Sequence, residues 1–307
     1  IIQYISMDEK LRIVVSGGGT GGHIFPAVSI ANAIKAKHPD AEILFVGALG
    51  RMEMERVPQA GYEIVGLPVR GLIRPLWSPK NVGVLIDFLR SKHKVRKVLK
   101  DFRPMAAVGV GGYASAATLN AAHAMGVPCL IQEQNSYAGV TNKVLASGAD
   151  KICVAYDGME RFFPADKIIK TGNPVRQSLI ESTISVEDAR KSFGLDPEKK
   201  TVVFVGGSLG ARTVNESILR HLDLVEQAKD IQFIWQTGKY YNASINKEIE
   251  GKKPGNLLVT DFISDMGAAY KAADLVISRA GASSISEFCL IGKPVVLVPS
   301  PNVAEDH

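Results

Sequence analysis

Short apolar runs alternate with helical patterns along most of the chain. In the first half these runs are "IVVS", "AEILFVGA", "YEIVGLPV", "MAAVGVGG", "VPCLIQEQN" and "KICVAY", and a long helical pattern spans 81–102. Nearly continuous apolar runs are typical of strands that are buried on both faces of a sheet. Because strands alternate with helices, the pattern predicts an α/β fold with a parallel sheet covered by helices.

The pattern starts again in the second half. The apolar runs "TVVFVGG", "IQFIWQTG", "NLLVTDFI", "DLVISRAG" and "PVVLVPS" alternate with the helical patterns "GSLGARTVNESILRHL", "DMGAAYKAA" and "SSISEFCLIG". Glycine and proline interrupt both periodicities at 172–176. We therefore predict two Rossmann-like domains, 7–172 and 173–307, which agrees with a length of 307 residues at roughly 150 residues per domain.

Glycine turns separate four of the predicted strands from the helices that follow, at 17–22, 109–112, 206–210 and Gly281. Glycine allows positive φ and a close approach of the backbone to a ligand, and a helix N-terminus offers unpaired N–H groups. Phosphate is the ligand that such turns favour. Because ligands of open α/β sheets bind at the carboxyl ends of the strands, we predict one phosphate-binding edge in each domain.

Several common nucleotide and metal sites are excluded by what the turns lack. The first turn matches G-x-G-x-x-G, but the second strand ends "FVGALGR", without the acid that holds the ribose of a nicotinamide cofactor. The sequence contains neither G-x-x-x-x-G-K-[ST] nor an Asp-x-Asp pair, and its three cysteines lack metal-ligand spacing. We therefore expect no metal and no cofactor, buried reduced cysteines, and a pyrophosphate neutralised by helix ends and Arg or Lys.

Composition adds few constraints. The formal net charge of +5 is too small to indicate a nucleic-acid-binding protein. No apolar run reaches the roughly 18 residues of a membrane span, and the start "IIQYISMDEKLR" lacks a signal-peptide pattern. We expect a cytoplasmic protein, with Met7 as a possible native start.

The helical pattern over 81–102 carries much of the basic charge. Its apolar residues at helical spacing are Leu85, Phe88, Leu89, Val95, Leu99 and Phe102, and its basic residues are Arg90, Lys92, Lys94, Arg96, Lys97 and Lys100. Further apolar residues precede it at Leu72, Ile73, Leu76 and Trp77. A basic amphipathic helix of this kind predicts a peripheral, anionic membrane surface; the alternative is a crossover helix with a solvated charged face.

Six motifs carry a family resemblance. "GGTGGHIFPA", "GVGGYASAATLNAA", "QEQNSYAGVTNK", "GNPVRQ", "VGGSLGARTVN" and "SRAGASSISEF" occur in this order, and the resemblance covers the chain from Leu11 onward. The sequence is similar to the MurG family of bacterial glycosyltransferases. The resemblance implies a GT-B fold, in which two Rossmann-like domains face each other across a cleft.

The resemblance also implies an activity and a location. Enzymes of this family move N-acetylglucosamine from UDP-N-acetylglucosamine to a lipid-linked muramyl-pentapeptide, with inversion and without a metal, in peptidoglycan synthesis. The acceptor would bind the N-terminal domain and the donor mainly the C-terminal domain. The implied place of action is the cytoplasmic face of the bacterial inner membrane.

Site residues follow from the motif matches. The residues that the resemblance assigns to the donor are Thr20, Gly21, Gly22, Asn135, Arg176, Ser208, Ile263, Ala282, Ser283, Ser284, Ile285, Ser286 and Glu287. Within this set, Ser208 and the "AGASSISEF" helix start would hold the diphosphate, and Arg176 would contact phosphate or uracil-side groups. Glu287 would hold the ribose and the Ile263 backbone the uracil. Gly19, Tyr113 and Glu133 match residues on the acceptor side.

His23 is the expected general base, because it ends the first glycine turn and has an unperturbed pKa near 6.5. A helix N-terminus should lower that pKa and favour the neutral, proton-accepting form. The alternatives are that His23 only hydrogen-bonds the loop or caps the helix, and that Glu133 is the base.

Other functions stay open at this point. They are a UDP-N-acetylglucosamine epimerase of the same fold, a non-catalytic nucleotide-sugar-binding subunit, and, less favoured, a nicotinamide oxidoreductase. The family pattern continues beyond "PNVAEDH". We therefore expect a truncated C-terminal end and a donor-sugar contact outside this sequence.

Overall fold

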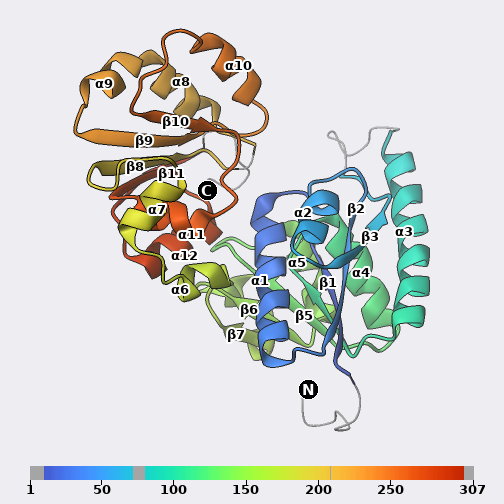
Figure 1. Cartoon of the computed structure of the whole chain (residues 1–307). Helices are drawn as coiled ribbons and strands as arrows, with labels where there is room; N and C mark the ends of the chain where they lie inside the picture. Colours follow the sequence, from blue (N-terminus) through green and yellow to red (C-terminus); the bar gives the residue numbers. More distant parts are fainter. Residues whose placement is uncertain (1–9, 72–79, 208, 301–307) are drawn as a thin grey trace. The chain divides into compact units, whose positions relative to one another are not determined.

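The computed structural model describes residues 10–71, 80–207 and 209–300. The chain separates into two compact units, Ile1–Val175 and Arg176–His307 (Figure 1). The division falls within the predicted interruption at 172–176.

Unit 1 contains a seven-stranded parallel sheet in the order β3-β2-β1-β4-β5-β6-β7. Its strands are β1(Arg12–Ser16), β2(Glu42–Ala48), β3(Glu63–Leu67), β4(Ala106–Gly109), β5(Cys129–Glu133), β6(Lys151–Val154) and β7(Ile168–Lys170). Its helices are α1(Gly21–Lys37), α2(Glu53–Gln59), α3(Lys80–Phe102), α4(Tyr113–Ala124) and α5(Val140–Leu145), with short 3-10 helices η2(Ala146–Gly148), η3(Met159–Arg161) and η4(Ala165–Lys167).

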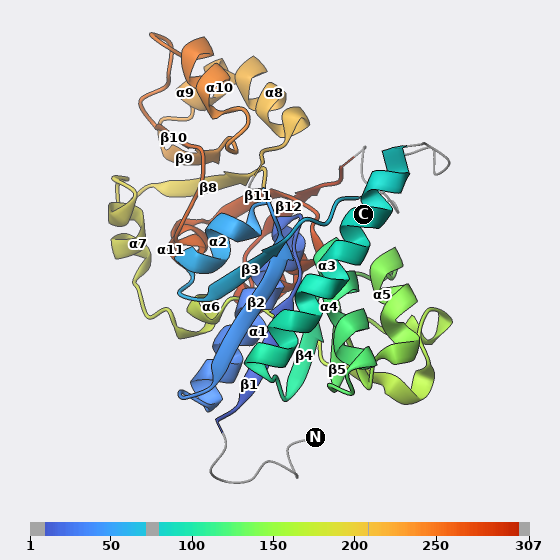
Figure 2. The same cartoon turned by 90° about the vertical axis from the view of Figure 1, so that its right-hand side faces the viewer.

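The β1 strand shows how unit 1 is packed. Ile13 and Val15 point to one face of the sheet, where they pack with α1 and α2, and Val14 points to the other face, towards α3 and α4. Side chains alternate between the two faces of a strand, so a continuous apolar run serves both cores. On the second face α3 and α4 pack side by side (Figure 2).

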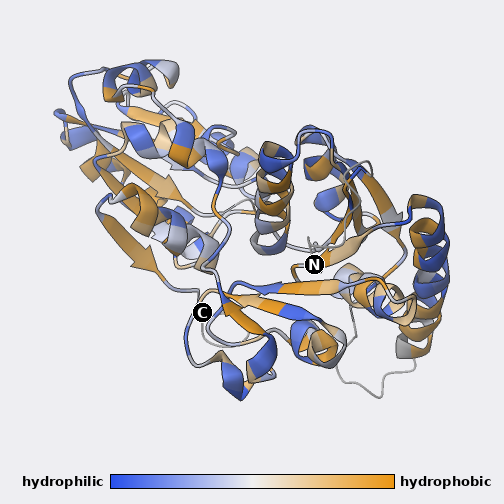
Figure 3. Cartoon of the chain, turned by 90° about the horizontal axis from the view of Figure 1, so that it is seen from below, coloured by the Kyte–Doolittle hydropathy of each residue, from blue (hydrophilic) through white to orange (hydrophobic). Residues whose placement is uncertain are grey.

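Unit 2 repeats this plan with five parallel strands in the order β10-β9-β8-β11-β12. Its strands are β8(Lys200–Val205), β9(Ile231–Gln236), β10(Leu257–Thr260), β11(Leu275–Arg279) and β12(Val295–Val298). Its helices are α6(Gln177–Glu181), α7(Val186–Ser192), α8(Arg212–Arg220), α9(Leu222–Gln227), α10(Asn242–Glu248), α11(Met266–Ala272) and α12(Ala282–Ile291). Figure 3 shows the hydrophobic colour along strands of both sheets, as the apolar runs predict.

Each sheet reverses its strand order beside its first strand. In unit 1, β1 lies between β2 and β4, and in unit 2, β8 lies between β9 and β11. The crevice at such a switch point is the usual ligand site of an open α/β sheet. Because Ser16 pairs with Gly109 and Val205 pairs with Ser278, the predicted glycine turns lie next to each other at the carboxyl ends of these strands.

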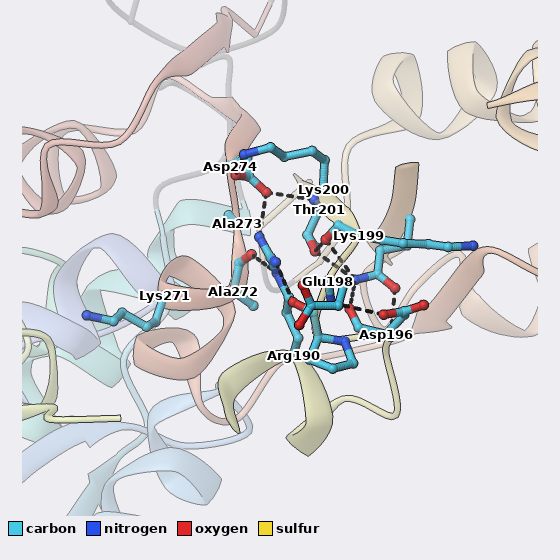
Figure 4. Close-up of polar contacts among 12 residues, drawn as sticks. Arg190, Asp196, Glu198, Lys199, Lys200, Thr201, Lys271, Ala272, Ala273 and Asp274 are labelled. Atoms are coloured by element: carbon cyan, nitrogen blue, oxygen red, sulfur yellow. Dashed lines mark hydrogen bonds and ion pairs between the residues drawn. The ribbon is translucent and has the colours of Figure 1, made fainter. Parts of the chain in front are cut away.

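A polar network closes the opposite end of the unit 2 sheet (Figure 4). Asp274 accepts hydrogen bonds from Arg190 Nη2 at 2.8 Å, Lys200 Nζ at 2.9 Å and the Thr201 N–H at 2.8 Å. Burial acts to raise the pKa of Asp274, but the Thr201 N–H and the two cations outweigh it, so that the pKa is lowered. The network joins α7 to the amino ends of β8 and β11, away from the glycine turns, and is structural.

The α3 helix divides the apolar residues that the sequence places at helical spacing. Val95 and Leu99 are buried, whereas Leu85 and Leu89 are exposed. Val84 and Ser91 of the same helix are also buried. Leu72, Ile73, Leu76 and Trp77 lie outside the described residues. Cys289 is also exposed and Cys153 half-buried, so only Cys129 is the buried core thiol that the sequence predicted.

Candidate functional site

The first glycine turn of unit 1 joins β1 to α1. Gly19 has φ +89°, which favours glycine, and Thr20 has the extended backbone of a residue that precedes a helix. The Thr20 carbonyl accepts hydrogen bonds from the N–H groups of His23 and Ile24, and Gly21 and Gly22 form the start of α1. The turn therefore exposes backbone at the helix N-terminus, where an anion is favoured.

His23 is half-buried and its ring is oriented by the turn. Its Nδ1 lies 3.1 Å from the carbonyl oxygen of Gly18. A carbonyl oxygen can only accept, so we assign the proton to Nδ1 and the lone pair to Nε2. Burial lowers the pKa of His23, while the Gly18 carbonyl and the charges of Glu133 and Glu53 act to raise it.

The second glycine turn packs directly against the first. A Cβ on Gly112 would lie 2.6 Å from the Gly18 oxygen, and a Cβ on Gly111 would lie 2.8 Å from His23 Nε2. Both glycines have positive φ. A side chain on Gly111 would displace the imidazole, so this glycine leaves room for His23. Tyr113 follows at the start of α4 and is exposed.

Glu133 organises the loop after β5. Its buried carboxylate accepts hydrogen bonds from the N–H groups of Asn135 and Gly139, both at 3.0 Å, and from the Asn142 side chain at 2.9 Å. These partners occupy both oxygens. Glu133 is therefore a loop-organising residue next to His23 rather than an unengaged carboxylate, and half-buried Asn135 is held by it.

The glycine turn after β8 is supported from behind by a second loop. Gly207 and Gly210 have positive φ. A Cβ on Gly210 would lie 2.2 Å from the Thr237 carbonyl oxygen, and a Cβ on Gly238 would lie 2.0 Å from the Gly210 nitrogen. The two backbones touch, which leaves no room for side chains between them. Ser208, the predicted diphosphate contact in this turn, lies outside the described residues.

The α12 helix begins at the carboxyl end of β11, next to the β8 turn. Gly281 precedes it, and the first backbone hydrogen bond of the helix runs from the Ile285 N–H to the Gly281 carbonyl. The N–H groups of Ala282, Ser283 and Ser284 therefore have no acceptor within the helix. Together with the partial positive charge of the helix end, they can bind a phosphate. The Ser286 hydroxyl donates to the Ala282 carbonyl of the same helix at 3.1 Å.

Arg176 and Glu287 form an ion pair below this helix start. Arg176 Nη1 lies 3.1 Å from Glu287 Oε2, and the Tyr270 hydroxyl donates to the same oxygen at 3.4 Å. Glu287 is only 4% exposed. Its burial raises the pKa of Glu287, an effect that Arg176 and Tyr270 reduce. The pair brings together two predicted site residues that are 111 positions apart in sequence.

Ile263, whose backbone the resemblance assigns to the uracil, is buried in the same core as Tyr270 and is only 3% exposed. Sequence reasoning missed Tyr270, Asn142 and Glu53. Tyr270 and Asn142 give no sequence signal, because each acts through one hydrogen bond to a distant acid. Glu53 holds the first glycine turn through a hydrogen bond from the Gly19 N–H.

Two absences apply to the described part of the chain only. Within it, no group of three His, Cys, Asp or Glu side chains is placed to hold a metal ion. None of its helices combines the length and the apolar character needed to cross a bilayer.

Family models match both units. The glycosyltransferase family 28 N-terminal domain matches residues 13–154, and the glycosyltransferase family 28 C-terminal domain matches residues 201–307. Among curated proteins, the UDP-N-acetylglucosamine--N-acetylmuramyl-(pentapeptide) pyrophosphoryl-undecaprenol N-acetylglucosamine transferase of Bacteroides fragilis is 66% identical over 97% of this chain and 79% of its own length. The protein of the same name from Phocaeicola vulgatus is 67% identical over 98% of this chain and 80% of its own length.

Solved structures agree on the fold. The MurG structure of Acinetobacter baumannii aligns with a TM-score of 0.67 at 27% identity, and covers 97% of this chain and 81% of its own. A putative UDP-N-acetylglucosamine 2-epimerase from Listeria monocytogenes aligns with the same TM-score and the same coverage at 12% identity. At that identity the second likeness concerns the fold alone.

Proposed function

Because the chain belongs to glycosyltransferase family 28, we propose that it transfers N-acetylglucosamine from UDP-N-acetylglucosamine to a muramyl-pentapeptide carried on a pyrophosphoryl lipid (lipid I), which gives lipid II for peptidoglycan. The observation that carries this proposal is the identity of 66–67% to curated transferases of that name, over nearly the whole chain. The fold has the two α/β units of a GT-B enzyme, and each unit has glycine turns at its switch point.

The reaction is an inverting displacement. The Nε2 lone pair of His23 takes the proton from the acceptor sugar hydroxyl, whose oxygen then attacks the anomeric carbon of the donor sugar. The bond from that carbon to UDP breaks, and UDP leaves with the bonding electrons. Gly19 to Gly22 supply backbone that can approach the acceptor diphosphate, and Tyr113 is exposed beside them.

The leaving diphosphate is stabilised by unit 2. The free N–H groups at the start of α12 and the guanidinium of Arg176 supply positive charge where negative charge develops. We propose that this replaces a divalent cation, so that transfer proceeds without a metal or a cofactor. Glu287 would then accept the ribose hydroxyls, with Arg176 opposing the rise of its pKa that burial causes.

A transfer assay tests the function directly. Radiolabelled UDP-N-acetylglucosamine is incubated with lipid-linked muramyl-pentapeptide, with and without EDTA, and label in the lipid fraction is counted. We expect transfer that EDTA does not reduce. Conversion of the donor alone, without acceptor, would instead support an epimerase, whose structure shares the fold. UDP binding without either reaction would support a nucleotide-sugar-binding subunit.

We also propose that α3 holds the protein on an anionic membrane, at the cytoplasmic face of the bacterial inner membrane where the lipid acceptor is used. The outward face of the helix, at spacing i, i+3, i+4, i+7, carries Val82, Leu85, Ile86 and Leu89, which are 45–63% exposed. The same face continues with exposed Arg96, Lys97 and Lys100. An apolar half beside a basic half suits a bilayer surface.

Neutralising Arg96, Lys97 and Lys100 to glutamine is expected to weaken binding to phosphatidylglycerol vesicles by ~10²-fold, since each basic residue near such a surface contributes about 1 kcal/mol. Sedimentation with vesicles at two salt concentrations is the measurement, and wild-type binding should fall as salt rises. The charge-matched control is K247Q/K252Q/K253Q in unit 2, at exposed positions. Equal binding by the α3 triple variant and wild type would leave α3 as an ordinary crossover helix.

A further inference from the structure

Glu53, the first residue of α2, lies fully buried beneath the first glycine turn. Its Oε2 accepts the N–H of Gly19 at 3.0 Å, and its Oε1 accepts the N–H of Ala48 at 2.9 Å. A buried carboxylate is costly unless it is well hydrogen-bonded, and here both oxygens are bound to backbone. The carboxylate therefore ties the turn after β1 to the end of β2.

Two glycines are shaped around this carboxylate. A Cβ on Gly18 would lie 2.1 Å from Glu53 Oε1, and a Cβ on Gly47 would lie 2.6 Å from Glu53 Cγ. Neither position tolerates a side chain while Glu53 is in place. Part of the glycine content of "GGGTGG" is therefore explained by Glu53 and not by a ligand.

The contacts of Glu53 and His23 meet on one peptide group. The N–H of Gly19 donates to Glu53, and the carbonyl oxygen of Gly18, in the same peptide plane, accepts from His23 Nδ1. In a planar trans peptide these two groups point in opposite directions. Fixing the N–H therefore fixes the direction of the carbonyl, and hydrogen bonds in such a chain strengthen one another.

The residues of the turn itself do little to fix the orientation of the Gly18–Gly19 peptide plane. It joins two glycines, and Gly19 has φ +89°, a region in which glycine is free to move. The anchor has to come from elsewhere in the fold, and Glu53 supplies it from α2, 34 positions along the chain.

We propose that Glu53 is a positioning residue for the transfer reaction. It holds the Gly18–Gly19 peptide so that the Gly18 carbonyl keeps the His23 proton on Nδ1 and leaves the Nε2 lone pair for the acceptor hydroxyl. The catalytic part of this inference rests on the proposed function, in which His23 is the base. The structural part concerns the free protein and can be tested without substrate.

The same carboxylate acts on the charge of His23. Burial lowers the pKa of His23, and the charges that oppose this come from Glu133, at the end of β5, and Glu53, on α2. Without the charge of Glu53, one of the effects that raise the His23 pKa against burial is lost. The imidazole of an E53Q variant should therefore titrate at lower pH than in the wild type.

The variants are E53Q, E53D and the control E55Q, which removes the same charge from an exposed position of the same helix. Glutamine presents an NH₂ group to one of the two backbone N–H donors, and aspartate is too short to reach both. For E53Q we expect a kcat lowered about 10²-fold, the effect of misplacing a catalytic group by about 1 Å. The KM for UDP-N-acetylglucosamine should be unchanged, and E53D should lie between E53Q and wild type.

NMR of ¹⁵N-histidine-labelled protein provides the readout that a merely structural role would not move. The His23 signals, assigned by their loss in H23Q, should show a mixed tautomer and a lower pKa in E53Q but not in E55Q. If E53Q folds and its His23 signals match those of the wild type, the proposal is overturned. If E53Q does not fold, wild-type His23 signals in E53D would overturn it. Changed signals with unchanged kcat would support the structural part, in which Glu53 orients His23, and would overturn the catalytic part, in which that orientation serves the transfer reaction.

Discussion

Replacing His23 with alanine is expected to lower kcat by about 10²–10⁴-fold, the range for loss of a general base. The expectation rests on the Nδ1 contact to Gly18 at 3.1 Å, which leaves the Nε2 lone pair available, and on the lowered pKa, which keeps the ring neutral near pH 7. Steady-state transfer at saturating donor and acceptor is the measurement. UDP binding, which we assign to unit 2, should be unchanged.

H23Q is the matched variant, because its amide can still donate to the Gly18 carbonyl but cannot accept a proton in catalysis. If His23 only supports the turn, H23Q should keep most of the activity and H23A should lose it together with thermal stability. Both variants are expected to be inactive and to melt near the wild-type temperature. Wild-type turnover in H23Q would give the base role to another residue.

The rate should also depend on pH in a defined direction. Because burial lowers the pKa of His23, the neutral base persists to lower pH than for a free imidazole. The acid limb of kcat/KM should therefore lie below the unperturbed value of about 6.5, and H23Q should lack this limb.

The sequence predicted the fold well because its information is local. Runs such as "IVVS" bury both faces of a strand, and the glycine turns mark where strands end, so parallel α/β units and their functional edges follow from short stretches. The orientation of α3 could not be predicted from such short stretches. Leu85 and Val84 are both apolar and adjacent in sequence, yet Val84 is buried and Leu85 is exposed on a helix that packs against α4.

The candidate site was predicted in part for the same reason. His23 and the first residues of α12 stand at turns that the sequence marks, whereas Glu53 stands on a short helix and acts on a turn 34 positions away. Glu133 was predicted to face the acceptor, but its bonds to Asn135, Gly139 and Asn142 depend on how the loop after β5 closes on itself. Such contacts become visible only in the three-dimensional structure. No rule of sequence spacing relates a buried acid to the backbone N–H groups from which it accepts hydrogen bonds.

Replacing Arg176 with alanine is expected to weaken UDP binding by about 10–10²-fold, as a charge-assisted hydrogen bond contributes roughly 1.5–3 kcal/mol. Uridine, which lacks the diphosphate, should lose less affinity than UDP. Calorimetry with both ligands separates the two cases, and Arg220→Ala, at an exposed ion pair on α8, is the control. Equal UDP affinity in wild type and R176A would place the diphosphate elsewhere.

The ion pair with Glu287 adds a second consequence of this substitution. Arg176 acts to lower the pKa of Glu287 against the raising effect of burial, so its removal should raise that pKa further. UDP affinity of R176A should then begin to fall at a higher pH than that of wild type, because a protonated Glu287 accepts ribose hydroxyls less well. In a double-mutant cycle with E287Q the two effects should be non-additive, since the side chains are in contact at 3.1 Å. Strict additivity would mean that Arg176 binds the diphosphate without acting on the ribose site.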